Sequence, residues 1–227
     1  MPSRLDFGAP YIAPASLAGV VEKEILNRFR CVCYMSNKGL LLFLSGPGGV
    51  GKSSICNCLA DQLPAVFIPS ATTRTEKPQD KLGKQYIFVN EEEFSRMIEK
   101  GEFLEYANVF GHLYGTMKRP VLDALASGKT ALLEIDVQGG MDIARLFPDS
   151  VGIFILPPSK QALNQRLSKR GRDDPEVIQK RLRGAEKEIQ VAKESGVYRI
   201  TIENNVLEDT VQQLLTLVNK LKTDPKK

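Results

Sequence analysis

Residues 46–53 read Gly-Pro-Gly-Gly-Val-Gly-Lys-Ser, which satisfies the pattern G-x-x-x-x-G-K-[ST]. Glycines let successive backbone N–H groups turn inward, and they leave no Cβ atoms that would block a bound anion. The helix expected after this segment adds free N–H groups and a dipole that favour negative charge. The pattern therefore predicts a phosphate-binding loop between a buried strand and a helix.

Within this loop each polar side chain has an expected partner. Lys52 is expected to reach the β- and γ-phosphates of a nucleoside triphosphate, and the Ser53 hydroxyl is expected to ligate Mg²⁺. The predicted ATP-binding residues are Gly46, Pro47, Gly48, Gly49, Val50, Gly51, Lys52, Ser53 and Ser54. The loop alone does not identify the reaction, because GTPases, motor ATPases and small-molecule kinases share it.

Apolar runs alternate with helical patterns along the rest of the chain. Short continuous apolar runs are typical of buried parallel strands, and Asn90 with Glu93 resembles the start of a capped helix that ends at Gly101. This alternation predicts an α/β fold with a mostly parallel sheet flanked by helices. The expected strands are Leu40–Leu44, Val66–Ile68, Thr130–Ile135 and Val151–Leu156, and the first expected helix is Lys52–Leu63.

The segment from Ser159 to Ser195 is helical in pattern and rich in arginine. A turn is expected at Gly171–Asp174, with Asp174 as the N-cap and Pro175 at the first helical position of the next helix. Two helices joined by a hinge suit a lid. The apolar positions expected to form one stripe are Ile178, Leu182, Ala185, Ile189 and Ala192.

Composition limits the class of protein. The chain has 227 residues, 42% of them hydrophobic, and a formal net charge of +4, which is too low for a typical nucleic-acid binder. No apolar run approaches the roughly 18–20 residues that span a bilayer. The four cysteines form two Cys-x-Cys pairs, which differ from the usual zinc spacing, so free thiols in a reducing cytoplasm are the expectation and a zinc site the alternative.

Three clusters after the loop suit the second substrate. Arg74 with the hydroxyls of Tyr86 and Tyr114 suits a phosphomonoester, because a guanidinium group matches phosphate bidentately. Glu105 suits guanine, because a carboxylate accepts from N1–H and the exocyclic amine together. The hydroxyls of Ser70 and Thr116 are expected to donate to the guanine O6 atom.

These motifs together resemble the guanylate kinase family over about residues 40–220. The matching motifs, in chain order, are the phosphate loop, Ser-Ala-Thr-Thr-Arg, Gly-Lys-Gln-Tyr-Ile-Phe, Glu-Phe-Leu-Glu, Tyr-Gly-Thr, Ile-Asp-Val-Gln-Gly, Pro-Pro-Ser and Arg-Leu-Ser-Lys-Arg-Gly. The resemblance implies a P-loop NTPase-type sheet, a small mixed GMP-binding insert and a helical lid. It implies transfer of the γ-phosphoryl group of MgATP to GMP and dGMP, giving ADP and GDP, in cytoplasmic purine metabolism.

The resemblance also implies roles and boundaries. Asp136 is implied to lie near the guanine, and Arg170 and Arg181 to close over the transferred phosphoryl group with Lys52 and Arg74 as the catalytic cations. The implied GMP-binding residues are Ser70, Arg74, Lys77, Tyr86, Glu105, Tyr114, Thr116 and Asp136. The expected domain is 38–222, with a core of 38–69, 118–156 and 196–222, a GMP-binding region of 70–117, a lid of 157–195 and a tail of 223–227.

The chain departs from the family pattern at three positions near these motifs. Lys77 replaces a common arginine and keeps the charge but loses the bidentate geometry, so weaker GMP-phosphate binding is expected. Gly48 stands where serine is common, and Glu134 stands where aspartate is common. Three residues keep simpler alternatives: Asp136 as a helix cap, His112 as a surface residue, and Arg166 as either a nucleotide contact or the partner of a carboxylate.

Two other functions remain open from the sequence. A kinase for AMP or dTMP would share the fold, although Glu105 with Ser70 and Thr116 favours guanine. A guanylate-kinase-like interaction module without activity would also share it, although such modules typically have degraded phosphate loops, and this chain keeps Gly51, Lys52 and Ser53.

Residues 1–37 differ from the rest of the chain and are expected to be an extension. They lack the apolar segment of a secretory signal, and they mix acidic with basic residues, unlike a mitochondrial transit peptide. Met35 begins a segment that leads directly into the first strand, so we expect residues 1–34 to be absent from the native protein. The intact mass of the protein from its own host measures this, and a native species that begins at Met1 or Pro2 would contradict it.

Overall fold

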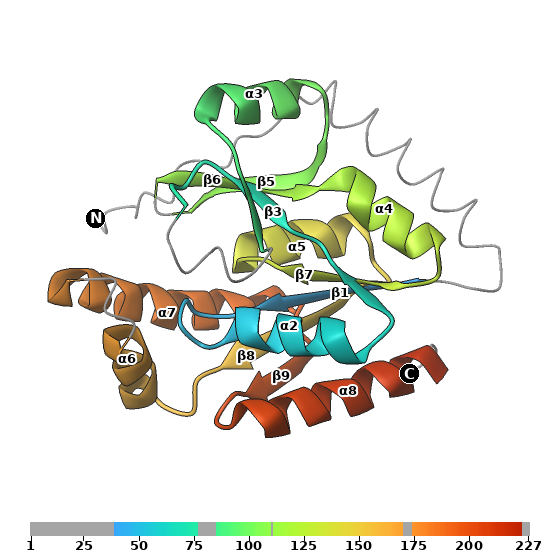
Figure 1. Cartoon of the computed structure of the whole chain (residues 1–227). Helices are drawn as coiled ribbons and strands as arrows, with labels where there is room; N and C mark the ends of the chain where they lie inside the picture. The colour runs from blue at the N-terminus through green and yellow to red at the C-terminus, as the bar shows by residue number, and fades with distance from the viewer. Residues whose placement is uncertain (1–38, 77–84, 110, 170–173, 224–227) are drawn as a thin grey trace. The chain divides into compact units, whose positions relative to one another are not determined.

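The structure is a computed structural model that describes residues 39–76, 85–109, 111–169 and 174–223 (Figure 1). The expectations for residues 1–37, Lys77, Arg170, the start of the turn at Gly171 and the tail from residue 224 lie outside these residues. The described residues form two compact units. Residues 68–128 belong to the smaller unit, and residues 40–67 and 129–223 belong to the larger unit.

The larger unit contains a five-stranded sheet in the order β2-β7-β1-β8-β9, and all its strand pairs are parallel. Its strands are β1 (Leu40–Ser45), β2 (Ala65–Phe67), β7 (Thr130–Glu134), β8 (Val151–Leu156) and β9 (Ile200–Glu203). Its helices are α2 (Lys52–Gln62), α5 (Val137–Leu146), α6 (Lys160–Lys169), α7 (Pro175–Ser195) and α8 (Leu207–Thr223). The predicted α/β fold is therefore confirmed.

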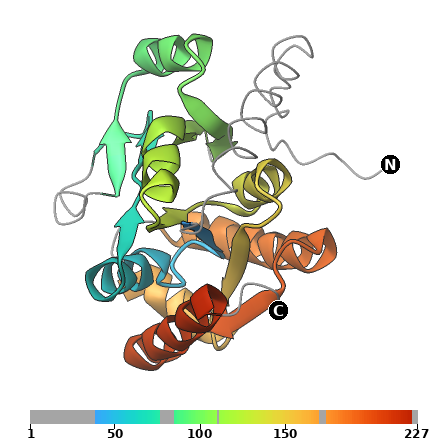
Figure 2. The same cartoon turned by 90° about the vertical axis from the view of Figure 1, so that its right-hand side faces the viewer.

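The central strand β1 is buried on both faces. Leu42 and Leu44 belong to a core that they share with residues of α2 and α8, two helices that lie side by side in Figures 1 and 2. Phe43 is equally buried but has its ring against Tyr198, on the side of α5 and α7. This two-sided burial explains why β1 is a continuous apolar run rather than an alternating one.

Three of the four expected strands have slightly different bounds. β1 runs one residue further than expected, to Ser45. β2 is Ala65–Phe67 rather than Val66–Ile68, because it pairs only along the register from Ala65 opposite Thr130 to Phe67 opposite Leu132. Ile68 stays buried after the pairing ends. β7 ends at Glu134, so Ile135 lies in the connection to α5.

The predicted stripe of α7 is confirmed as a packing surface. Its first three members, Ile178, Leu182 and Ala185, form a small core with Leu163 and Leu167 of α6. Its last two members, Ile189 and Ala192, pack with residues of α5 and β8. One helix therefore contributes to two separate cores of the larger unit.

Helix ends follow the predicted chemistry with one exception. The Asn90 side chain accepts a hydrogen bond of 2.7 Å from the Glu93 N–H, and Gly101 adopts a left-handed φ of 64° after the helix. Pro175 occupies the first turn of α7 as expected. Asp174 is at the N-cap position, but its side chain makes no capping hydrogen bond, so that part of the prediction is wrong.

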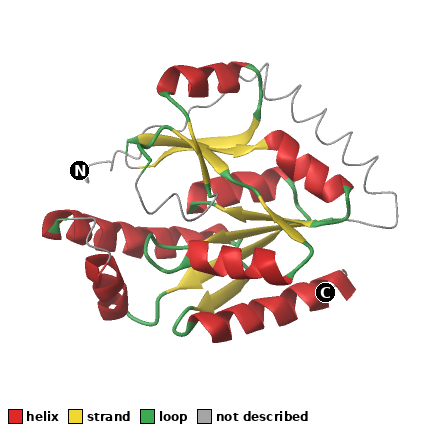
Figure 3. Cartoon of the chain, in the orientation of Figure 1, coloured by secondary structure: helices red, strands yellow, loops and turns green. Residues whose placement is uncertain are grey.

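The smaller unit is built on a mixed four-stranded sheet in the order β4-β3-β6-β5 (Figure 3). β3 pairs in parallel with β4 and antiparallel with β6, and β5 pairs antiparallel with β6. Its elements are β3 (Ser70–Thr72), β4 (Tyr86–Phe88), α3 (Glu91–Glu99), β5 (Phe103–Val109), β6 (His112–Met117) and α4 (Lys118–Ala126).

A compact aromatic core joins α3 to this sheet. The rings of Phe94 and Phe103 stack with centroids 4.6 Å apart, and Ala71 completes the buried cluster. A Cβ atom added at Gly115 would lie 2.7 Å from a ring carbon of Phe103, so glycine is needed where this ring crosses β6.

We expect Asn90→Ala to destabilise the protein by about 1 kcal/mol, because the first turn of α3 loses its side-chain acceptor. Asn90→Ser is the matched control, since serine supplies a similar acceptor and should stay near the wild type. Urea unfolding followed by circular dichroism measures both variants. Equal losses in the two variants would show that the cap is not the cause.

Candidate active site

The phosphate loop joins β1 to α2, and three of its glycines have backbone conformations that other residues rarely adopt. Gly46, Gly49 and Gly51 have φ angles of 144°, 94° and 104°. A Cβ atom at Gly46 would lie 2.3 Å from the Ile155 carbonyl oxygen, which belongs to the adjacent strand. Gly48 does not have a positive φ, and a Cβ atom there would meet open space, so a residue with a side chain, such as serine, would fit at this position.

Lys52 and Ser53 begin α2 and make different contacts. The Lys52 ammonium group donates to the carbonyl oxygens of Gly46 at 2.6 Å and Pro47 at 3.3 Å, so it lies along the loop. The Ser53 hydroxyl donates to Oε1 of Glu134, 3.0 Å away at the end of β7. Among the described residues, the buried Oε2 of Glu134 has no hydrogen-bond partner. Hydroxyl and carboxylate oxygens are the ligands that Mg²⁺ prefers, so this pair fits the ion.

Two residues that are distant in the sequence, Arg166 and Asn204, donate hydrogen bonds to the phosphate loop at Val50. The Val50 carbonyl accepts a 2.7 Å hydrogen bond from the Asn204 amide and a 3.2 Å bond from the Arg166 guanidinium. Arg166 also donates to the carbonyls of Asn204 and Asn205. Among the described residues the Arg166 guanidinium group thus binds backbone carbonyls rather than a carboxylate, and its contact with nucleotide stays a prediction.

The position of Asn204 also explains one glycine of the loop. A Cβ atom at Gly51 would lie 2.5 Å from the Asn204 side-chain nitrogen. The Asn204 amide is in turn oriented by Thr210, whose hydroxyl donates to its side-chain oxygen at 3.0 Å. Sequence reasoning left Asn204 without a role, since an asparagine between strand and helix carries no signal of a contact 154 residues earlier.

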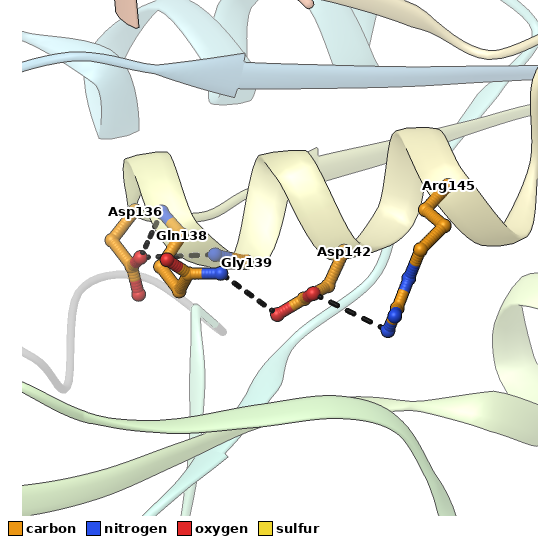
Figure 4. Close-up of polar contacts among 5 residues, drawn as sticks. All are labelled: Asp136, Gln138, Gly139, Asp142 and Arg145. Atoms are coloured by element: carbon orange, nitrogen blue, oxygen red, sulfur yellow. Dashed lines mark hydrogen bonds and ion pairs between the residues drawn. The ribbon is translucent and has the colours of Figure 1, made fainter. Parts of the chain in front are cut away.

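Asp136 caps α5, as Figure 4 shows. Its Oδ1 atom accepts from the N–H groups of Gln138 at 2.8 Å and Gly139 at 3.0 Å. Burial raises the pKa of the Asp136 carboxyl, while these two N–H groups and the positive charge of Lys52 oppose the rise. The simpler interpretation of Asp136 as a helix cap is therefore confirmed, and its contact with guanine stays a prediction. Both capping bonds use the same oxygen atom.

Polar contacts continue along α5 from this cap. The Gln138 amide donates to Asp142 at 3.3 Å, and Arg145 pairs with the same carboxylate at 3.5 Å (Figure 4). These side chains lie one turn apart, at the spacing where helical residues meet. These contacts link the polar side chains of α5 that follow Asp136 in the sequence.

Glu188 is a member of this site that sequence reasoning missed. It lies on α7, and burial raises the pKa of its carboxyl to about 7, with the charge of Lys52 opposing the rise and that of Asp136 adding to it. Lys52 therefore acts on two half-buried carboxylates, Glu188 on α7 and Asp136 at the start of α5. The sequence carried only one signal of this role, a charged residue next to the apolar stripe of α7.

The smaller unit gathers the residues predicted to hold a phosphate. The Arg74 guanidinium lies 5.2 Å from the centroid of the Tyr86 ring and 5.3 Å from that of Phe88, and one of its nitrogens donates to the Thr75 carbonyl at 3.0 Å. The rings of Tyr86 and Tyr114 meet edge to face at 6.0 Å. The structure thus brings together Arg74 and both tyrosines.

The residues predicted to face guanine also lie together. The Thr116 hydroxyl donates to the Glu105 carboxylate, and Thr116 pairs directly with Ser70 across the antiparallel strands β6 and β3. Ser70 pairs on its other side with Tyr86. Tyr86, Ser70, Thr116 and Glu105 therefore form one continuous row across all four strands of this sheet.

The remaining candidates fall into three groups. Lys77 and Arg170 lie outside the described residues, and Arg181 lies half-buried on α7. Cys56 and Cys58 are free thiols, and the described part of the chain holds no cluster of three or more metal-ligating His, Cys, Asp or Glu side chains. Across the described ranges, we find no helix with the length and apolar character needed to cross a membrane.

A parallel sheet whose central strand leads through a glycine-rich loop into a helix defines a P-loop nucleotide-binding protein of the α/β class. The family model described as "Guanylate kinase" matches residues 38–221. The chain belongs to the guanylate kinase family.

Individual relatives agree with this assignment. A guanylate kinase of Trichodesmium erythraeum is 44% identical over 177 residues, covering 78% of this chain and 94% of its own. A guanylate kinase of Carboxydothermus hydrogenoformans is 41% identical, covering 84% and 93%. The crystal structure of guanylate kinase from Anaplasma phagocytophilum superposes with a TM-score of 0.66 at 32% identity, covering 82% of this chain and 87% of that one.

We expect Gly46→Ala to abolish ATP binding, because its Cβ atom would overlap the Ile155 carbonyl and displace the loop. Gly48→Ala is the matched control, since a Cβ atom there meets open space. The rise in Tm on addition of MgATP measures binding in each variant. A normal rise for Gly46→Ala would show that the loop tolerates the displacement.

We expect Glu188→Gln to stabilise the protein at high pH only. The folded pKa is raised from 4.5 to about 7, so the folded state binds more protons, and stability falls as pH rises between these values. Glutamine removes this loss. The variant should melt about 2–4 °C above the wild type at pH 8, the size of a change of about 1 kcal/mol in a domain of this length, and equal it near pH 4.5.

The exposed Glu194, six residues further along α7, supplies the control Glu194→Gln. This variant should follow the wild type at both pH values. A pH-independent difference for Glu188→Gln would contradict the raised pKa.

Proposed function

We propose that this chain transfers the γ-phosphoryl group of MgATP to GMP and dGMP, giving ADP with GDP or dGDP, and that it serves purine nucleotide metabolism in the cytoplasm. One observation supports GMP as the phosphoryl acceptor. It is the row of residues across the smaller sheet, formed by Tyr86, Ser70, Thr116 and Glu105. Neighbouring strands lie about 4.8 Å apart, so the row spans roughly 14 Å from its tyrosine to its carboxylate.

The two ends of this row suit the two ends of a nucleotide. At the Tyr86 end, Arg74 and Tyr114 supply a guanidinium group and a second phenol for the phosphate. At the other end, Glu105 supplies the acceptor that guanine N1–H and its exocyclic amine require. Ser70 and Thr116 lie between them and supply hydroxyl groups. Lys77 is proposed to add a further charge on the phosphate side.

The donor half of the reaction rests on the phosphate loop. Residues 46–54 are proposed to surround the ATP phosphates with backbone N–H groups, and Lys52 to leave its carbonyl partners for the β- and γ-phosphates. Ser53 and Glu134 would hold Mg²⁺. When bound, the ion supplies positive charge that offsets the charge moving toward the β-phosphate.

The reaction is an in-line displacement. A phosphate oxygen of GMP attacks the γ-phosphorus, the bond from that phosphorus to the β,γ-bridging oxygen breaks, and ADP leaves with the bond electrons. Lys52, Arg74, Arg170 and Arg181 are proposed to neutralise charge on the transferred group. Such cations repel one another in an empty site, so assembly on substrate binding is favoured, and closure also excludes water.

We propose a separate role for each segment of the chain. The core of 38–69, 118–156 and 196–222 binds ATP, the region 70–117 binds GMP, and the segment 157–195 closes as a lid that carries Arg170 and Arg181. Residues 1–37 and 223–227 are proposed to lie outside the enzyme domain. The hydrogen bond from Arg166 to the Val50 carbonyl ties the first lid helix to the phosphate loop. Movement of the lid is therefore proposed to occur beyond Arg166.

The substrate assay tests this function directly. With GMP, dGMP, AMP, UMP and dTMP in parallel at fixed MgATP, we expect kcat/KM for GMP to exceed that for AMP by at least about 100-fold, because a site built to pair buried polar groups rejects a base that leaves them unpaired. A coupled assay of ADP release measures all five. A preference for AMP or dTMP would overturn the proposal.

Two variants separate the two halves of the site. Lys52→Ala should lower kcat by at least about 100-fold with every acceptor, because it removes charge stabilisation in the transition state. Glu105→Gln should lower kcat/KM for GMP and leave the ATP-dependent rise in Tm intact. No MgATP-dependent rise in Tm in the wild type, together with no turnover, would instead favour an interaction module.

A further inference from the structure

Tyr198 places a buried hydroxyl group behind the phosphate loop. It lies in the connection between α7 and β9, and its hydroxyl oxygen is 2.9 Å from the Ser45 hydroxyl and 3.2 Å from the Val137 carbonyl. Ser45 is the last residue of β1, and its hydroxyl donates to the Asp136 carbonyl at 3.2 Å. Three segments far apart in the sequence therefore meet through two hydroxyl groups.

The surroundings hold the Tyr198 side chain in one place. The rings of Phe43 and Phe154 contact it edge to face, with centroid distances of 5.8 and 5.3 Å. A Cβ atom added at Gly140 would lie 2.0 Å from the Tyr198 hydroxyl oxygen, so α5 needs glycine where this group approaches. The ring is fixed by packing, and its hydroxyl reaches the first turn of α5.

The protons carried by these groups allow few arrangements. Each hydroxyl has one proton to donate, and the 2.9 Å contact between Tyr198 and Ser45 requires one of the two. If Tyr198 donates to Ser45, then Ser45 donates to the Asp136 carbonyl. If Ser45 donates to Tyr198, then Tyr198 donates to the Val137 carbonyl. In both cases one hydroxyl of the pair donates to a backbone carbonyl at the start of α5, either that of the N-cap Asp136 or that of the first helical residue Val137.

The Tyr198 hydroxyl also stays protonated. Burial raises the pKa of this phenol most, the Ser45 hydrogen bond lowers it by less, and the nearby carboxylates of Asp136 and Glu188 each add a smaller rise. The group is therefore a permanent donor rather than a titrating one. A permanent donor suits a structural link between the strand that enters the phosphate loop and the cap of α5.

We propose that Tyr198 is a positioning residue that, together with Ser45, holds the start of α5, and with it Asp136, at a fixed place relative to the phosphate loop. This inference rests on the proposed function together with the prediction that Asp136 lies near the guanine of GMP. Loss of the Tyr198 hydroxyl should therefore affect use of GMP more than use of ATP. The phosphate loop itself keeps its other supports, the close contact of Gly46 with Ile155 and the bonds from Asn204 and Arg166 to Val50.

Tyr198→Phe tests this, since it removes one oxygen atom and keeps the packed ring. We expect kcat/KM for GMP to fall about five-fold, the effect of one lost hydrogen bond, while KM for ATP changes less than about two-fold. Ser195→Ala is the matched control. It removes bonds to Ala192 and Val197 in the same connection, without contact to Ser45 or Asp136, and should leave both constants unchanged.

Ser45→Ala and the double variant complete the test. If Tyr198 acts through Ser45, the loss in the double variant should be smaller than the product of the two single losses. Unchanged constants in Tyr198→Phe, equal losses for ATP and GMP, or fully multiplicative losses would each overturn the inference. Measured Tm values show that the variants are folded. An inactive wild type would instead refute the proposed function itself.

Discussion

The close approach of Gly46 to the backbone of β8 is the contact on which the rest of the larger unit depends. A Cβ atom there would lie 2.3 Å from the Ile155 carbonyl oxygen, and the φ of 144° is unfavourable for other residues. The chain therefore turns directly at the end of β1 instead of passing over the sheet. This turn sets the start of α2, and with it the positions of Lys52 and Ser53.

Electrostatically, Lys52 is the common partner of the buried acidic groups in this unit. Its charge lowers the pKa of the carboxyls of Asp136 and Glu188, although burial raises both by more. It also lowers the pKa of the Cys56 thiol, which burial and Glu134 raise. Lys52 itself donates to two carbonyls of its own loop. The charge of Lys52 thus acts on each of these groups while its ammonium group is held beside the loop.

Sequence patterns predicted the larger unit well, because its signals are local. Continuous apolar runs predicted β1 and β8. The spacing of Ile178, Leu182 and Ala185 predicted the buried side of α7. Two strands of the smaller unit, β3 and β4, left no such signal. Ser70–Thr72 and Tyr86–Phe88 are three residues each, too short for an alternating pattern to be read.

For the candidate site, motifs identified side chains but not their partners. The loop pattern indicated Lys52 and Ser53, and the acceptor motifs indicated Arg74 and Glu105. Glu188 and Asn204 could not be predicted, because their importance comes from long-range contacts rather than from neighbouring sequence. Arg166 shows the same limit: its helical spacing was readable, but its binding to the Val50 carbonyl was not.

The support of the Val50 carbonyl by distant residues also bears on how the protein is made. The loop lies early in the chain, but its supports, Arg166 and Asn204, are synthesised much later, and Thr210, which orients Asn204, later still. A nascent chain that has completed the motif has therefore not yet completed the site. The two hydrogen bonds to the Val50 carbonyl can form only after residue 204 has been added to the chain.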